Sequence, residues 1–150
     1  MRSLYQPDAA SEIQERLRGL SPSSVRQWGT MTAAQAMAHC SNAMENATGD
    51  VKPPRMFIGR VIGPMVKKMA VSDDRPLKKN SPTSPELKVG DARQLDTEKE
   101  RLSGLIERFV SAGPAGCTTH PHSFFGHMTA DEWGVLMFKH VDHHLRQFGE

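Results

Sequence analysis

The fold is indicated most clearly by one stretch near the end of the chain, Thr129-Ala130-Asp131-Glu132-Trp133-Gly134-Val135-Leu136-Met137-Phe138-Lys139-His140-Val141-Asp142-His143-His144-Leu145-Arg146-Gln147-Phe148. Thr129 and Glu132 form the Thr-x-x-Glu pattern of a capping box, which predicts a helix start. At ~100° per residue, His140 and His144 lie about one turn apart on one face of that helix. Apolar residues share that side: Trp133, Leu136, Met137 and Phe148. The stretch therefore predicts a helix that turns two imidazoles inward.

An inward pair of imidazoles needs partners, because burying an unpaired polar group costs about 1–3 kcal/mol. A metal ion bound by the i, i+4 pair is one solution, and ordinary hydrogen bonds in the core are the other. His143 lies ~60° from His140 and is either a rival ligand or a neighbouring group. Gln147 follows within the next turns, so it either orients a ligand from outside or is a solvated or capping residue.

Composition restricts the class of protein. The 150 residues fit one domain spanning 1–150. A net charge of +2, from 19 basic and 17 acidic residues, is too balanced to indicate a nucleic-acid partner. No apolar run approaches the ~18–20 residues that span a bilayer, so no membrane partner is expected. The first residues hold no apolar signal core, and Cys40 and Cys117 form no Cys-x-x-Cys motif. We therefore expect a cytoplasmic protein with free thiols.

Helical periodicity recurs along the chain, and no strand-type alternation of useful length appears. Thr32 and Gln35 form a second capping box, which predicts a helix to about Gly49. A first helix is predicted over 8–20, an irregular one with Gly59, Gly63 and Pro64 over 55–70, and another from 91 or 96 to 112. Residues 72–90 and 117–128 are predicted loops. The fold class is all-α, with four main helices, an extra irregular helix and a long loop in the middle.

The predicted second helix adds one more histidine, His39, in a stripe of small alanines. Ligand sites in helical bundles are built from side chains on facing helices. His39, His140 and His144 would leave a coordination position open, which is typical of catalytic sites. Nitrogen ligands suit zinc, nickel, iron or copper. The histidines outside helices, His120, His122 and His127, either line a pocket mouth or pack within their loop.

Three blocks of sequence resemble an uncharacterised branch of the DinB/YfiT-like proteins. They are Trp28-Gly29-x-Met31-Thr32-x-x-Gln35-x-x-x-His39-Cys40, then His120-Pro121 with Phe125-Gly126 and Thr129-x-x-Glu132-Trp133, and finally His140-Val141-Asp142-His143-His144-Leu145-Arg146-Gln147-Phe148-Gly149. The resemblance implies a four-helix bundle with a divalent metal held by one histidine of the second helix and a His-x-x-x-His pair of the last. Those positions are His39, His140 and His144. We expect that metal to be zinc or nickel.

Two hypotheses for the function follow. The first is a divalent-metal-dependent enzyme acting on a small molecule, either a transferase that uses a low-molecular-weight thiol cofactor, as the resemblance implies, or a hydrolase. The ion would lower the pKa of a bound water or thiol. The alternative is a non-catalytic metal- or ligand-binding bundle, in which the ion mainly stabilises the fold. A homodimer is compatible with either hypothesis, and a solvent-open or sealed site would discriminate between them.

Overall fold

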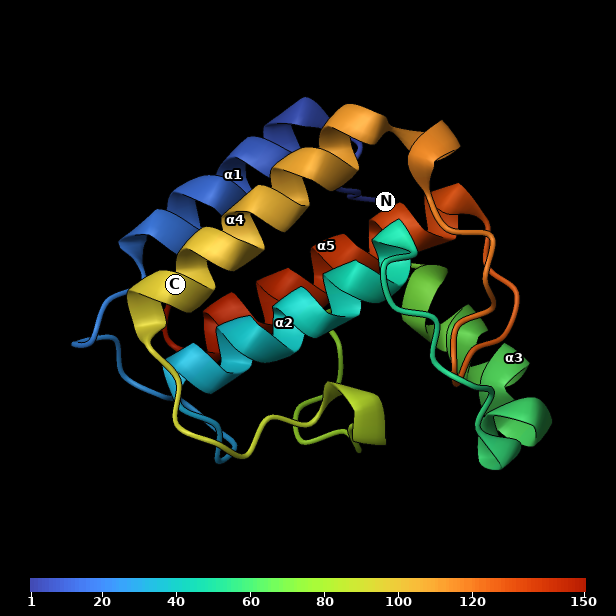
Figure 1. The fold of residues 1–150 in the computed structure, drawn as a ribbon, viewed down its shortest axis with the longest axis horizontal. Coiled ribbons are helices and arrows are strands. Elements are labelled where there is room, and N and C mark those ends of the chain that lie inside the picture. Colours follow the sequence, from blue (N-terminus) through green and yellow to red (C-terminus); the bar gives the residue numbers. More distant parts are fainter.

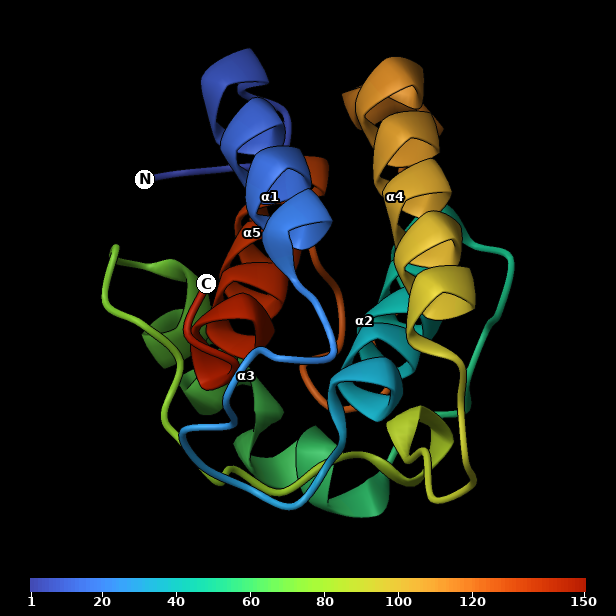
Figure 2. The same ribbon diagram turned by 90° about the vertical axis from the view of Figure 1, so that its left-hand side faces the viewer.

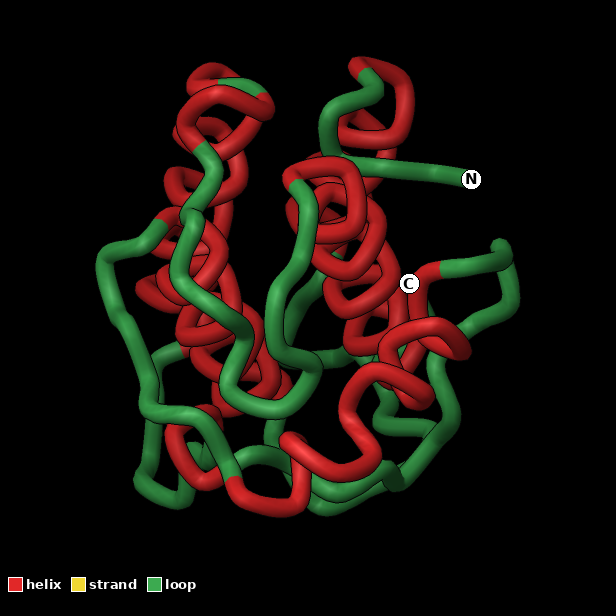
Figure 3. Tube along the Cα trace, turned by 90° about the vertical axis from the view of Figure 1, so that its right-hand side faces the viewer, coloured by secondary structure: helices red, strands yellow, loops and turns green.

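The structure is a computed structural model that describes all 150 residues. It consists of five α-helices and two short 3-10 helices, with no β-strand (Figure 3). The all-helical prediction is therefore confirmed. The elements in chain order are α1 (Pro7–Gly19), α2 (Ala33–Thr48), α3 (Phe57–Val71), η1 (Pro85–Leu87), α4 (Leu95–Ala112), η2 (Pro114–Gly116) and α5 (Ala130–Gln147).

Four helices surround the apolar core. Helices α1 and α4 lie side by side over the pair formed by α2 and α5, as two perpendicular views show (Figures 1 and 2). Helix α2 also contacts α4, and α1 contacts α5, so the contacts close a ring. The 24 buried apolar residues of the core include Leu17, Met44, Ile106 and Leu145. Burial of these side chains places α2 and α5 next to each other.

The two helices that carry the predicted ligands both start with a complete capping box. The Thr32 hydroxyl accepts from the Gln35 amide at 3.1 Å, and the Gln35 side chain accepts from the Thr32 amide at 2.9 Å. Thr129 and Glu132 form the matching pair at 3.2 and 2.8 Å. A cap of this kind stabilises a helix by about 1 kcal/mol. Both helix starts are therefore set by local sequence, as predicted.

Helix α3 starts two residues later than the sequence predicted. The Met56 amide donates to the Ser123 carbonyl at 2.9 Å, and the Arg55 guanidinium donates to the His122 carbonyl at 3.2 Å. These contacts hold residues 55–56 as an extended segment against a loop far away in sequence. The predicted start at Arg55 is therefore wrong, because a tertiary contact overrides the local helical pattern.

Two glycines bring α3 against the loop before α5. A β-carbon added at Gly59 or Gly63 would lie 2.4 or 2.1 Å from the Phe124 carbonyl oxygen. No larger side chain fits at that separation without moving backbone. The glycines that made the sequence pattern irregular are therefore the contact surface of α3.

The segment between α3 and α4 wraps the side of the α2–α5 pair that faces away from α1 and α4 (Figure 1). It contains η1, which contacts α2, so the predicted loop over 72–90 is interrupted by one helical turn. Lys79 of this segment lies over the Trp28 ring at 4.2 Å from its centroid. No helix of the chain combines the length and apolar character needed to cross a membrane.

Candidate metal centre

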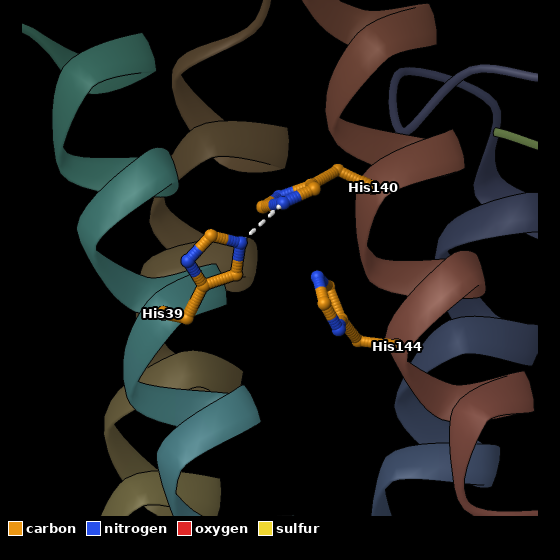
Figure 4. A group of neighbouring side chains, drawn as sticks. All are labelled: His39, His140 and His144. Carbon is orange, nitrogen blue, oxygen red and sulfur yellow. Dashed lines mark hydrogen bonds between the residues drawn. The ribbon is translucent and has the colours of Figure 1, made fainter. Parts of the chain in front are cut away.

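Three histidines from two neighbouring helices meet between α2 and α5. His39 points from α2 toward His140 and His144, which lie one turn apart on α5 (Figure 4). One potential ligand atom from each residue lies within 4.8 Å of the others. The structure thus brings together the three residues that the sequence selected. Their role as metal ligands stays a prediction.

A carbonyl group from the wrapping segment determines which nitrogen of His39 carries the hydrogen. The Nδ1 atom lies 2.8 Å from the carbonyl oxygen of Leu87 in η1. A carbonyl oxygen can only accept, so Nδ1–H is the donor and Nε2 has a free lone pair. That lone pair points toward the other two histidines (Figure 4).

A glutamine holds His144 in the same tautomer. The Gln147 amide nitrogen donates to the Trp28 carbonyl at 2.8 Å, which assigns the amide orientation. The Gln147 oxygen therefore faces His144 and accepts from its Nδ1–H at 2.8 Å. The lone pair of His144 is consequently on Nε2. The sequence left Gln147 as either an orienting group or a solvated or capping residue. In the structure it is buried and bonded to His144.

His140 completes the cluster and leaves one polar atom without a partner. Its Nε2 lies 2.8 Å from Nε2 of His39, and since that nitrogen carries no hydrogen, His140 donates the bond. The Nδ1 atom of His140 is buried and has no hydrogen-bond partner. A single hydrogen therefore lies between Nε2 of His39 and Nε2 of His140. A metal ion between the two nitrogens could bind both in its place.

Burial keeps these imidazoles neutral. It lowers the pKa of His39 below its ordinary value, against the opposing effect of the Leu87 carbonyl. It lowers the pKa of His140 well below the usual range, and proximity to His39 and His144 lowers it further. Burial also lowers the pKa of His144, to about 3. Neutral imidazole is the form that binds metal.

The residues fit a divalent cation bound by three nitrogens. Zinc-nitrogen bonds of about 2.0–2.1 Å at tetrahedral angles separate ligand atoms by roughly 3.4 Å. The nitrogens here lie from 2.8 Å, between His39 and His140, to at most 4.8 Å apart. Shifts of about 1 Å in ring position would bring all three to such a spacing. Imidazole-only ligation suits zinc or nickel better than calcium or magnesium.

The family model described as "Protein of unknown function (DUF1569)" matches residues 1–150. The chain belongs to the DUF1569 family. No curated protein and no solved structure matches it. Membership of DUF1569 therefore supplies no activity, and the chemistry has to be argued from the site itself.

In this DUF1569 protein, His143 and Cys40 lie outside the three-histidine cluster. His143 is half-buried, with its ring centroid 5.4 Å from that of Trp28, and it is not part of the three-histidine group. Cys40 is fully buried, and burial raises the pKa of its thiol. Cys40 is a free cysteine, as the sequence predicted, and its burial makes the thiol a poor nucleophile.

The loop histidines of this DUF1569 protein have different environments. His122 stacks on Phe125, lies near Trp133, and accepts from the backbone amides of residues 124 and 125 at 3.1 and 3.2 Å through Nδ1. Burial first, and then Arg55, lowers its pKa to about 4. The Nε2 atom of His120 lies 2.9 Å from the Pro53 carbonyl, and His127 is exposed. The sequence placed all three histidines in a loop, but it did not show that the His122 ring packs against Phe125 and Trp133.

Two surface hollows of the DUF1569 structure are lined by residues other than the three clustered histidines. A hollow of about 450 Å³ lies beside Arg16, Lys139 and Asp142, where ion pairs join helices α1 and α5. Another of about 500 Å³ lies beside Lys52, Cys117 and His120. Within the cluster, His39 and His144 are buried, and His140 is partly exposed. The cluster therefore lies outside both hollows, and His140 is its most exposed member.

Proposed function

We propose that this chain is a divalent-metal-dependent enzyme built on a four-helix bundle of the DinB/YfiT-like type. His39, His140 and His144 hold zinc or nickel, and a fourth position takes water or a low-molecular-weight thiol. The reaction is transfer of that thiol to an electrophile or hydrolysis of a small molecule. The ring of contacts among α1, α4, α2 and α5 supports the bundle, and the resemblance of the sequence blocks supports its type.

The observation that carries the proposal is the shared tautomer of His39 and His144. Both rings donate through Nδ1, one to Leu87 and the other to Gln147, so both present Nε2 lone pairs inward. A bonded outer nitrogen that leaves the inner one free is the usual arrangement around histidine ligands. Simple core histidines need no common centre, because each is satisfied by its own hydrogen bonds.

The protein's own groups prepare the site for a cation. Burial keeps three imidazoles neutral near pH 7, so no proton competes strongly for the lone pairs. When bound, such an ion lowers the pKa of a water or thiol and supplies a nucleophile at neutral pH. His140 is the only one of the three residues that is partly exposed, so in the proposed enzyme a small molecule reaches the centre on the His140 side.

A non-catalytic metal site is the second candidate, and the burial of His39 and His144 favours it. A chelator separates the two functions, because a structural ion contributes most of the folding free energy, whereas here the 24-residue apolar core is independent of the ion. We expect metal removal to lower the melting temperature without unfolding the chain at room temperature. Unfolding by chelator alone would favour the structural site.

Metal analysis of protein purified without added metal tests ligation directly. We expect about one equivalent of zinc or nickel in the wild type, and none in His140→Ala or His144→Ala. His143→Ala is the matched control on the same helix and should keep the ion. Loss of metal in His143→Ala with retention in His144→Ala would mean that the wrong pair was selected.

Activity is tested by offering the metal-loaded protein electrophiles together with thiols, and separately ester and amide substrates. Turnover that disappears with chelator and returns with the ion supports the enzyme. Tight metal binding without turnover in either assay, combined with unfolding by chelator, supports the structural alternative.

A further inference from the structure

Helix α3 presents an apolar surface to solvent, quite unlike the other helices. Five large apolar side chains on it are between 50 and 83% exposed. Exposed apolar residues are common singly, but a contiguous group on one element marks an interaction site. The five are Phe57, Ile58, Val61, Met65 and Met69.

These side chains form one stripe. At ~100° per residue they fall within an arc of about 120° along the whole helix. The opposite side of α3 holds Gly59 and Gly63, which contact the Phe124 backbone. Helix α3 lies at the margin of the molecule, away from α1 and α4 (Figures 1 and 2). The stripe therefore faces outward because the inner side is already committed to packing.

The charge of the same segment is entirely positive. Residues 51–71 contain five of the chain's 19 lysines and arginines and none of its 17 acidic residues. Lys67 pairs with Glu132 at 2.9 Å, and the Arg55 guanidinium donates to the carbonyl of His122. The remaining three, Lys52, Arg60 and Lys68, are exposed and take part in none of the ion pairs of the structure. At ~100° per residue, Arg60 lies about 60° beyond the Phe57 edge of the stripe, and Lys68 lies within the stripe, about 20° from Phe57. The exposed face of α3 therefore carries two cations outside any ion pair of the structure.

We propose that α3 docks on the surface of an anionic lipid bilayer, with its apolar stripe among the acyl chains and its cations at the headgroups. An apolar face bordered by Lys and Arg is the signature of helices that lie in the membrane interface. Docking of this kind needs no spanning segment. It revises the expectation of no membrane partner, which rested on the lack of a spanning run, and it is independent of the proposed metal chemistry.

The positive charge of this face favours an anionic bilayer over a second copy of the chain as its partner. A two-fold contact through this face would bring the same patch of both protomers together. Cations of one protomer, such as Arg60 and Lys68, would then lie near the cations of the other, with no acidic residue in 51–71 to neutralise them. Anionic headgroups supply the missing negative charge, and each cation adds to the attraction.

Vesicle co-sedimentation of the full chain tests the proposal. We expect binding to vesicles of phosphatidylcholine mixed with phosphatidylglycerol, and much weaker binding to phosphatidylcholine alone. Val61→Gln with Met65→Gln should reduce partition about tenfold or more, since two inserted side chains are lost. Arg60→Gln with Lys68→Gln should abolish the preference for anionic lipid, and added salt should weaken wild-type binding.

Matched controls separate docking from general effects. Val25 is 68% exposed but lies outside α3, so Val25→Gln should bind like the wild type. Lys78 and Lys88 are lysines elsewhere on the surface, so Lys78→Gln with Lys88→Gln should retain the lipid preference. Circular dichroism melts verify that every variant is folded, which is expected because all these positions are at the surface.

Three outcomes would overturn the proposal. One is wild-type protein that stays in the supernatant with both kinds of vesicle. Another is vesicle binding that the α3 variants leave unchanged. The third is a dimer in sedimentation equilibrium that Val61→Gln with Met65→Gln converts to monomer, without vesicle binding, which would assign the face to a second copy.

Discussion

Helices α5 and α3 have similar kinds of residues but differ in which of them are buried. Both combine apolar residues with lysine or arginine at helical spacing. Twelve of the 18 residues of α5 are buried, including Lys139, Asp142 and His144, whereas only three of the 15 residues of α3 are buried, two of them glycines. Polar groups are thus inside on one helix, and apolar groups are outside on the other.

The difference shows that neighbours, not local amphipathicity, determine burial. Helix α5 contacts α1, α2 and α3, and Lys139 of α5 also donates to the Asp73 carbonyl in the segment after α3. Two of its buried charged groups have partners on these neighbours: the Lys139 ammonium donates to the Ala70 carbonyl at 2.6 Å, and Asp142 pairs with Arg16 at 2.7 Å. Among the helices, α3 makes its main contact with α5. Its apolar face has no neighbour to pack against.

The sharpest test of this contrast is one large apolar side chain removed from each helix. Leu145 of α5 is fully buried, so Leu145→Ala should destabilise the protein by about 2–5 kcal/mol. Met65 of α3 is 63% exposed, so Met65→Ala should change stability by about 0.5 kcal/mol or less. Urea denaturation measures both. Equal losses would mean that α3 is packed in solution.

Acid should destabilise the protein, because protonation of His144 and His122 favours the unfolded chain. In metal-free protein, burial lowers the pKa of His144 to about 3 and of His122 to about 4. The unfolded chain binds protons at these residues below about pH 6.5, whereas the folded chain does not. Stability should therefore be unaffected above pH 6.5 and fall as pH drops toward 4, by on the order of 3 kcal/mol for each of the two residues.

Thermal melts with chelator present, recorded from pH 8 to 4, check this dependence. His144→Gln should show a shallower decline, because one buried titrating group is gone. Stability that is flat across this range would contradict the neutral, buried state of the cluster.

The contact between Gln147 and His144 should matter for metal affinity. Gln147→Leu keeps the volume but leaves His144 Nδ1 without its acceptor, so zinc affinity should fall about 10–100-fold. Arg146→Gln alters the exposed neighbour on the same helix and is the control. Competition with a chromophoric chelator measures both affinities. An unchanged affinity in Gln147→Leu would remove the orienting role.

Two glycine-to-alanine substitutions should change the free energy of unfolding in opposite directions. In α3, Gly63→Ala places a methyl group against the Phe124 carbonyl and should cost about 1–3 kcal/mol, with faster hydrogen exchange in α3. In α4, Gly104 has open space around its added carbon, so Gly104→Ala should stabilise by about 0.5–1 kcal/mol. A neutral Gly63→Ala would show that α3 is not seated on the loop.

Much of this molecule is determined by short-range sequence. The capping boxes at Thr32 and Thr129 set the starts of α2 and α5, because their hydrogen bonds join residues only three positions apart. Helical spacing places His140 and His144 on one face for the same local reason. The all-helical class and the choice of His39 as their neighbour therefore follow from the amino-acid sequence alone.

Tertiary structure alone decided what those residues contact. The acceptor of His39 is the Leu87 carbonyl, 48 positions away, and the amide of Gln147 is oriented by Trp28, 119 positions away. No local pattern encodes such partners, because they depend on how a wrapped loop and a chain end come together. The same holds for the outward face of α3, where apolar periodicity is equally consistent with a buried helix, and only the packing of Gly63 on residue 124 turns the stripe to solvent.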